Sequence, residues 1–205
     1  NPFHLLCILG ILTPLGAIIV LKSNLYDGWR QFYFIYPFIA IIITMGLIKF
    51  CKNINSFLII KYQKLTMLFA SIVILIEPVY SIYSMHPHQN VYYNLLAGND
   101  PMKKYEADYW GVSYKMGLEI LLEKVDGNIY LAIGNFPGKN NLQMINKTDR
   151  HRIKIVPFNE AEFYITNFRT NPLEYNKAKN KINPFHNEIY KIEYGNMKIL
   201  GVYKL

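Results

Sequence analysis

Residues 65–83, LTMLFASIVILIEPVYSIY, form an apolar run in which Glu77 is the only charged side chain. Two similar runs precede it: residues 5–21, LLCILGILTPLGAIIVL, carry no charge, and residues 32–50, FYFIYPFIAIIITMGLIKF, carry only Lys49. A helix rises about 1.5 Å per residue and needs about 20 residues to cross the apolar layer of a bilayer. None of the runs has the polar stripe that a buried helix of a water-soluble protein shows. We therefore predict three membrane spans.

The composition changes after the third run. Residues 1–85 contain six basic and two acidic side chains, whereas residues 86–205 contain 16 and 12. This predicts a membrane α-helical domain in residues 1–85, followed by a small soluble α/β domain in residues 86–205. Both cysteines, Cys7 and Cys51, fall in or beside the spans, so the second domain is expected to be stable without disulfides. Its basic residues are interspersed with acidic ones, which does not predict a nucleic-acid partner.

The short loops predict the orientation. Four basic residues lie at or between the second and third spans, against two in the loop of residues 22–31. Because cytoplasmic loops carry the excess of basic residues, residues 49–64 are expected in the cytoplasm. The chain is then a multi-pass protein of the cell membrane, and its C-terminal domain is extracytoplasmic. Aromatic residues at the outer ends of the spans, such as Tyr80 and Tyr83, fit interface anchors or a wall for a lipid chain.

The second half of the chain alternates between helix and strand patterns. Ser113 is expected to cap a helix whose apolar face carries Tyr114, Leu118 and Leu121. Residues 134–138 read as a loop, and Gly195-Asn196 reads as a hairpin turn. The other expected elements are strands at 129–133, 152–156, 162–166, 188–194 and 197–203, and a short helix at 140–146. These predict a small α/β sandwich.

His86-Pro87-His88 is the only histidine pair with spacing suited to metal ligands, and an extended backbone would put both rings on one side. No third ligand is evident, so the sequence predicts neither a metal site nor a cofactor, although it leaves a divalent metal open. It also contains no phosphate loop and no hydrolase or metalloprotease motif.

Three stretches are distinctive in their order around the spans: YDGWRQFYFIYP at residues 26–37, HPHQNVYYN at residues 86–94 and YEADYWG at residues 105–111. Together they resemble the C-terminal part of bacterial membrane glycosyltransferases of the GT-C type, which are related to dolichyl-phosphate-mannose protein mannosyltransferases. The resemblance implies transfer of a sugar from a polyprenyl-phosphate carrier to an acceptor, not identified by the sequence, at the outer membrane face. It also implies that the catalytic acidic residue lies in an earlier loop of a longer protein, outside this chain.

Seven residues are candidates for binding the carrier or the substrate: Asp27, Trp29, Arg30, Glu77, His86, Asp108 and Trp110. Arg30 is placed either to bind the carrier phosphate through its planar fork or to reach lipid headgroups. Asp27 either pairs with Arg30 or belongs to a turn. Glu77 is costly in lipid, and is expected to be either functional or a hydrogen-bonded structural carboxylate. Asp108 and Trp110 either contact a sugar or belong to a loop packed on the domain core.

A different class of function also fits the pattern, namely a non-enzymatic membrane anchor that carries an extracytoplasmic binding or assembly domain. It accounts for the spans and the domain. It does not account for the YDGWR loop lying on the same side of the membrane as residues 86–94.

Overall fold

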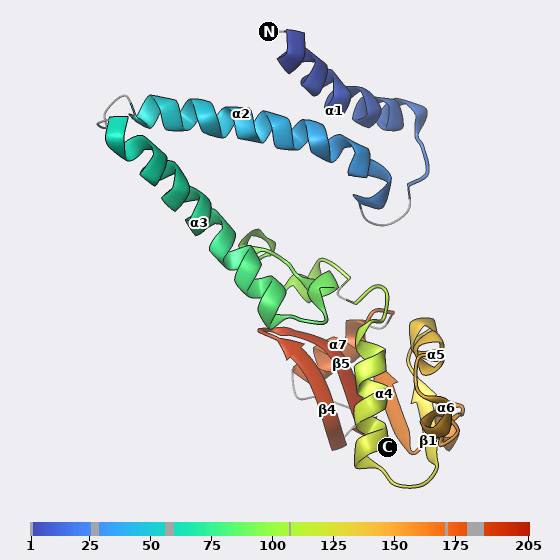
Figure 1. The fold of residues 1–205 in the computed structure, drawn as a ribbon. Coiled ribbons are helices and arrows are strands. Elements are labelled where there is room, and N and C mark those ends of the chain that lie inside the picture. Colours follow the sequence, from blue (N-terminus) through green and yellow to red (C-terminus); the bar gives the residue numbers. More distant parts are fainter. Residues whose placement is uncertain (1, 26–28, 56–59, 107, 171, 180–186) are drawn as a thin grey trace. The chain divides into compact units, whose positions relative to one another are not determined.

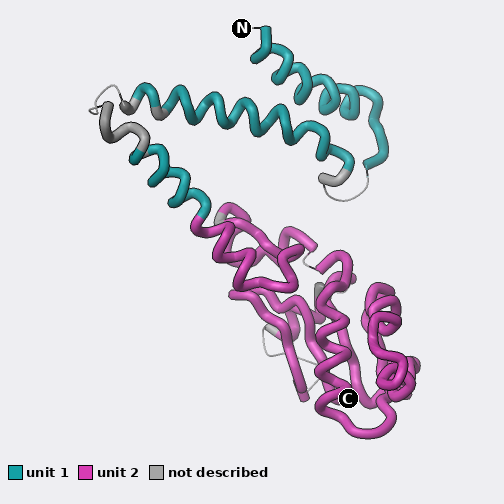
Figure 2. The backbone as a smooth tube through the Cα atoms, in the orientation of Figure 1, with its two compact units in different colours: residues 1–75 teal, residues 76–205 magenta. Residues whose placement is uncertain are grey.

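The computed structural model describes residues 2–25, 29–55, 60–106, 108–170, 172–179 and 187–205. The chain divides into two compact units, residues 1–75 and 76–205 (Figure 2). The division falls inside the third long helix, so the last turns of that helix belong to the second unit. Two hydrogen bonds hold them there: the Tyr92 hydroxyl donates to the Glu77 carboxylate at 2.5 Å, and the Gln89 side-chain amide donates to the carbonyl of Ile82 at 3.2 Å.

The three long helices of Figure 1 correspond to the three apolar runs of the sequence. They are α1 (Pro2–Leu21), α2 (Tyr36–Asn55) and α3 (Ile60–Ser84), and the 3-10 helix η1 (Trp29–Ile35) leads into α2. Among the described residues, three stretches are long and apolar enough to cross a membrane: Pro2–Leu21, Gln31–Phe50 and Met67–Ser84.

These helices present their apolar side chains outward. Val20 on α1 is 79% exposed and Tyr83 on α3 is 85% exposed. The hydroxyls of Thr44 and Ser71 donate to helix carbonyls one turn earlier, at 2.7 and 2.9 Å, so neither polar group needs water as a partner. Exposing so much apolar surface to water costs about 25 cal/mol per Å². The surface therefore favours an apolar surrounding.

The second unit is built on a mixed five-stranded sheet. Its strands are β1 (Ile129–Ile133), β2 (Ile153–Ile155), β3 (Phe163–Thr166), β4 (Asn187–Tyr194) and β5 (Met197–Lys204), in the order β2-β1-β3-β5-β4. Strand β1 runs parallel to both β2 and β3, whereas β5 runs antiparallel to β3 and β4. Since β1, β2, β3 and β4 share one direction, their carboxyl ends meet at one edge of the sheet.

Successive side chains of β1 and β3 pack into two different cores, because strand residues alternate between faces. One core joins Leu131 and Ile165 to Tyr114 and Leu118 of helix α4 (Ser113–Lys124). The other core joins side chains from the strands, from the turn after β3 and from helix α7 (Pro172–Lys179): Ala132, Tyr164, Phe168, Tyr175 and Tyr203. Helices on two faces of the sheet thus give a layered α/β unit.

Patterns that are local in the sequence predicted this unit well. The expected helix face of Tyr114, Leu118 and Leu121 is buried. The expected strands all form, and the final hairpin turns at Gly195, whose φ of 58° is a conformation that glycine adopts without strain.

The region after β1 was predicted incorrectly. Residues 136–138 are not a loop but the first turn of helix α5 (Phe136–Leu142), which ends before most of the short helix expected at 140–146. Proline is well tolerated in a first helical turn, as Pro137 is here. Gly138 is needed for close packing, since a Cβ there would lie 2.4 Å from Ile133. Helix α6 (Lys147–Arg150) and helix α7 were not expected at all.

Candidate functional site

Residues 85–106 and 108–110 lie across the edge where the carboxyl ends of β3 and β4 meet. His88 Nδ1 is 2.9 Å from the hydroxyl of Tyr194, the last residue of β4. The Asn196 side chain donates to the carbonyl of Asn99 at 3.2 Å. Just after β3, the Asn167 side chain donates to the carbonyl of Asp108 at 2.8 Å. Ligands of α/β sheets bind preferentially at this edge, so the two distinctive stretches at 86–94 and 105–111 meet where a site is expected.

Glu77 fixes the start of this segment to α3. Its carboxylate accepts hydrogen bonds from the Tyr92 hydroxyl at 2.5 Å and from the Ser81 hydroxyl at 3.2 Å. The hydrogen bond to Glu77, assisted by desolvation, raises the pKa of Tyr92. Glu77 therefore has the partners that a structural carboxylate needs, and it is best described as a positioning residue.

An open groove of about 710 Å³ runs along the end of α3. Its apolar wall is formed by Val79, Ile82 and Tyr83, and its polar rim by His86 and Gln89. The Gln89 side-chain amide donates to His86 Nδ1 at 2.8 Å. That bond leaves Nε2 as the N–H donor of the neutral His86 ring, which is exposed. An apolar wall beside an exposed donor suits an amphiphilic ligand.

His88 does not share the environment of His86. Its ring is fully buried against Tyr194, with centroids 5.9 Å apart, and Nε2 has no hydrogen-bond partner in the described part of the chain. The backbone turns at residues 85–87 and enters a 3-10 helix at Gln89–Val91, so it is not the extended segment that would put the two imidazoles on one side. Within the described ranges, no three His, Cys, Asp or Glu side chains are grouped to hold a metal ion.

Because His88 is buried, the free energy of unfolding is expected to depend on pH. Burial lowers the pKa of His88 below its usual 6.5, while the nearby Asp108 carboxylate raises it and the electrostatic interaction with the His86 imidazole lowers it further. When the pH falls below about 6.5, the unfolded chain protonates this imidazole and the folded chain does not. The free energy of unfolding should therefore fall by up to about 1.4 kcal/mol per pH unit, until the pH reaches the folded-state pKa.

Urea unfolding of the chain in detergent between pH 7.5 and 5 measures this slope. We expect His88→Leu to be less stable at neutral pH, because the Tyr194 hydroxyl loses its partner, and to lose the slope below pH 6.5. The exposed His151 provides the matched control, since His151→Gln should retain the slope. Equal slopes in the wild type and in His88→Leu would contradict this explanation.

Asp108 is fully buried, and both of its carboxylate oxygens accept hydrogen bonds from the protein. Oδ1 accepts from the Asn90 side chain at 3.0 Å and from the Val112 N–H at 2.9 Å. Oδ2 accepts from the Ser113 N–H at 2.8 Å and from its hydroxyl at 2.5 Å. The carboxylate thus accepts hydrogen bonds from the N–H groups at the start of α4. Ser113 is the first residue of that helix and not its N-cap, which is Val112. This geometry favours the packed-loop alternative for Asp108.

Trp110, beside it, is 62% exposed. Its ring meets the Tyr109 ring edge-on at 5.0 Å, and the guanidinium of Arg169 lies 3.7 Å from the centre of the Tyr109 ring. Trp110 therefore has an accessible aromatic surface next to a cation. Arg169 was missed by the sequence analysis, because only the fold brings it to residues 106–110.

The remaining three candidates belong to the first unit. Asp27 lies outside the described residues, and Trp29 and Arg30 begin η1, where the backbone alone is described. Their roles stay predictions. The structure does bring Glu77 and His86 to one end of α3, and it places Asp108 and Trp110 at the sheet edge.

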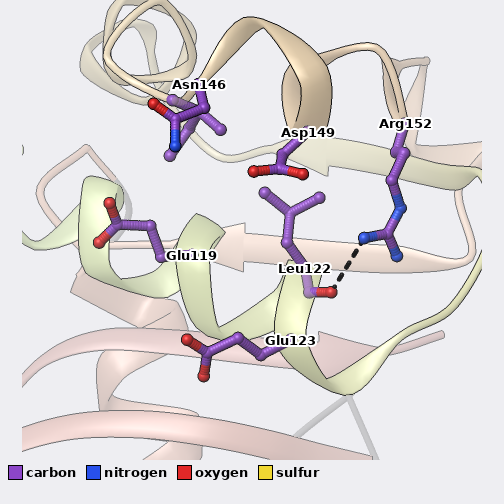
Figure 3. Close-up of a pocket in the computed structure, with 7 residues that line it drawn as sticks. Glu119, Leu122, Glu123, Asn146, Asp149 and Arg152 are labelled. Carbon is purple, nitrogen blue, oxygen red and sulfur yellow. Dashed lines mark hydrogen bonds between the residues drawn. The ribbon is translucent and has the colours of Figure 1, made fainter.

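A different cavity, of about 320 Å³, lies between α4 and α6 and is lined by acidic side chains and Arg152 (Figure 3). Arg152 donates to the carbonyls of Leu122 at 3.2 Å and Gly127 at 3.0 Å, and also to that of Val125. A cation that binds the last carbonyls of a helix stabilises its C-terminal end. We therefore assign Arg152 to the end of α4 and not to a binding site.

Comparison of the chain with protein-family models, with curated proteins and with solved structures finds no match in any of the three.

Proposed function

We propose that this chain is the C-terminal portion of an integral membrane glycosyltransferase, which transfers a sugar from a polyprenyl-phosphate carrier to an acceptor on the extracytoplasmic face. Three helices with the length and composition of membrane spans support the proposal, as does the resemblance carried by residues 26–37, 86–94 and 105–111. The catalytic acidic residue would lie outside this chain.

The groove at the end of α3 is the observation that carries the proposal. A polyprenyl phosphate needs an apolar wall for its chain and N–H donors for its phosphate at the water boundary. Val79, Ile82 and Tyr83 offer the wall, and His86 with Gln89 offers the polar rim. Both occur where an apolar helix ends, which is the depth at which a carrier phosphate rests. Arg30 remains a further candidate for the phosphate, because a guanidinium binds phosphate through two parallel hydrogen bonds.

A non-enzymatic anchor accounts for the helices and for the sheet. It gives no reason for a groove with an apolar wall and a polar rim at the end of α3. The glycosyltransferase proposal gives that reason.

Sugar transfer by the full-length protein tests this function. Membranes that contain the protein should transfer labelled sugar from a polyprenyl-phosphate donor to an acceptor, whereas membranes lacking it should not. His86→Ala removes the proposed hydrogen bond to the carrier phosphate, so the rate of sugar transfer at sub-saturating donor should fall about tenfold.

The exposed His151 serves again as control, and His151→Ala should transfer sugar at the wild-type rate. Absence of transfer by the wild type with any polyprenyl-phosphate sugar would reject the function. A wild-type rate of transfer by His86→Ala would be compatible with the function but would show that the groove does not bind the carrier.

A further inference from the structure

Another pocket, of about 290 Å³, opens at the carboxyl end of β3. It is formed by residues 102–106 together with Phe168, Arg169 and Tyr175. Three of these residues are cations, Lys103, Lys104 and Arg169, and one is an anion, Glu106. The balance of charge favours a negatively charged ligand.

The backbone after β3 holds Arg169 in a fixed position. The Phe168 N–H donates to the Thr166 hydroxyl at 3.1 Å, and the Arg169 N–H donates to the Asn167 side chain at 3.3 Å. Phe168 has a φ of 60°, which residues with a bulky side chain rarely adopt, so the surrounding contacts must impose it. The result is a preset turn that carries Arg169 into the pocket wall.

The guanidinium of Arg169 is oriented from two sides. Nε donates to Glu106 at 3.3 Å, and Nη1 donates to the Tyr109 carbonyl at 3.0 Å, while the group stacks on the Tyr109 ring. These hydrogen bonds use two of its five N–H groups. The side chain is only 22% exposed, so solvent screens its charge less than it screens a free surface cation.

The two lysines differ from each other. Lys103 pairs with Asp100 at 3.5 Å, whereas Lys104 is exposed and forms no ion pair with any described residue. Lys104 therefore adds to the pocket lining a positive charge that no described carboxylate pairs with, beside the oriented guanidinium of Arg169.

Aromatic rings border the same pocket. Tyr105 lines it, is half exposed, and stacks on Tyr93 with ring centroids 5.2 Å apart. Trp110 lies beyond Tyr109 with much of its ring exposed. The C–H faces of sugar rings stack on such surfaces while their hydroxyls remain free for polar partners.

We propose that this pocket binds the oxyanion group, phosphate or carboxylate, of a saccharide ligand, with Arg169 and Lys104 as its cationic contacts. Taken with the proposed function, on which this assignment rests, the ligand is the acceptor. Binding itself is measured without sugar transfer, so the two proposals fail separately.

Trp110 provides the readout, because the chain has two tryptophans and Trp29→Phe leaves Trp110 as the single indole. The full chain with this change, in nanodiscs of neutral phosphatidylcholine, is titrated with a hexose 6-phosphate and with the neutral hexose. We expect a saturable change in fluorescence with the phosphate and none with the neutral sugar, and weaker binding at higher ionic strength.

Four variants separate binding from folding. Arg169→Gln and Lys104→Gln should weaken hexose phosphate binding about tenfold, whereas Lys154→Gln, which removes an exposed lysine on β2, should not change it. Glu106→Gln breaks the same ion pair as Arg169→Gln but removes a competing carboxylate, so it should tighten binding. Opposite effects of these two changes cannot come from a shared loss of structure.

Nanodiscs that contain anionic phosphatidylglycerol identify the source of the oxyanion. Competition by this lipid would assign the pocket to a headgroup, and unchanged affinity would assign it to a soluble saccharide. The proposal is overturned if neither nanodisc gives saturable binding of the hexose phosphate. It is equally overturned if Arg169→Gln, Lys104→Gln and Lys154→Gln all bind with the same affinity.

Discussion

Replacing Asp108 by alanine should lower the free energy of unfolding of the second unit by about 3–5 kcal/mol. The carboxylate is fully buried and accepts four hydrogen bonds, from Asn90, Val112 and twice from Ser113. Its removal leaves buried donors at the start of α4 without an acceptor, and each buried unsatisfied group costs about 1–3 kcal/mol. It also removes a negative charge from the positive end of the helix dipole.

Urea unfolding of the full chain in detergent, followed by near-ultraviolet circular dichroism, measures this loss. Asp108→Asn should lie between the wild type and Asp108→Ala, because the amide retains one acceptor oxygen but turns a donor toward Ser113 or Val112. Asp126 is an exposed aspartate just after α4, and Asp126→Ala should change the stability by less than about 0.5 kcal/mol. Equal stability of Asp108→Ala and Asp126→Ala would contradict a structural role for Asp108.

The elements of the second unit that could be predicted are those set by short-range pattern. Helical spacing from Tyr114 to Leu121 identified α4, and Gly195 marked the final hairpin. The sheet order could not be predicted, since pairing β3 with both β1 and β5 joins segments that are distant in the sequence. Helix α5 was missed because its first turn contains Pro137 and Gly138, residues that are equally typical of a loop.

The candidate site also has features that could be predicted from the sequence and features that could not. The stretches at 86–94 and 105–111 were identified as distinctive, and the structure places both along one edge of the sheet. The partners within them were not predictable: the sequence left Asp108 either to contact a sugar or to belong to a packed loop, and only the fold shows that its oxygens accept hydrogen bonds from N–H groups at the start of α4. Arg169 is 63 residues from Glu106 in the sequence, so no local spacing pointed to their ion pair.

The glycosyltransferase proposal depends on one arrangement in space. The groove at the end of α3 and the pocket beside Arg169 must both face the side of the membrane where carrier-linked sugars are used. Loop charge alone predicts this orientation, with four basic residues around the loop between the second and third spans against two in the preceding loop.

Cysteine accessibility in intact cells tests that arrangement most directly. With Cys7 and Cys51 replaced by alanine in the full-length protein, single cysteines are placed at Ser23 before η1, at Asn53 near the end of α2 and at Asp126 after α4. All three positions are exposed, so burial does not limit their reaction with a membrane-impermeant maleimide. We expect labelling of Ser23→Cys and Asp126→Cys in intact cells, and labelling of Asn53→Cys only after permeabilisation. Labelling of Asn53→Cys in intact cells, with Asp126→Cys protected until the membrane is opened, would contradict that arrangement.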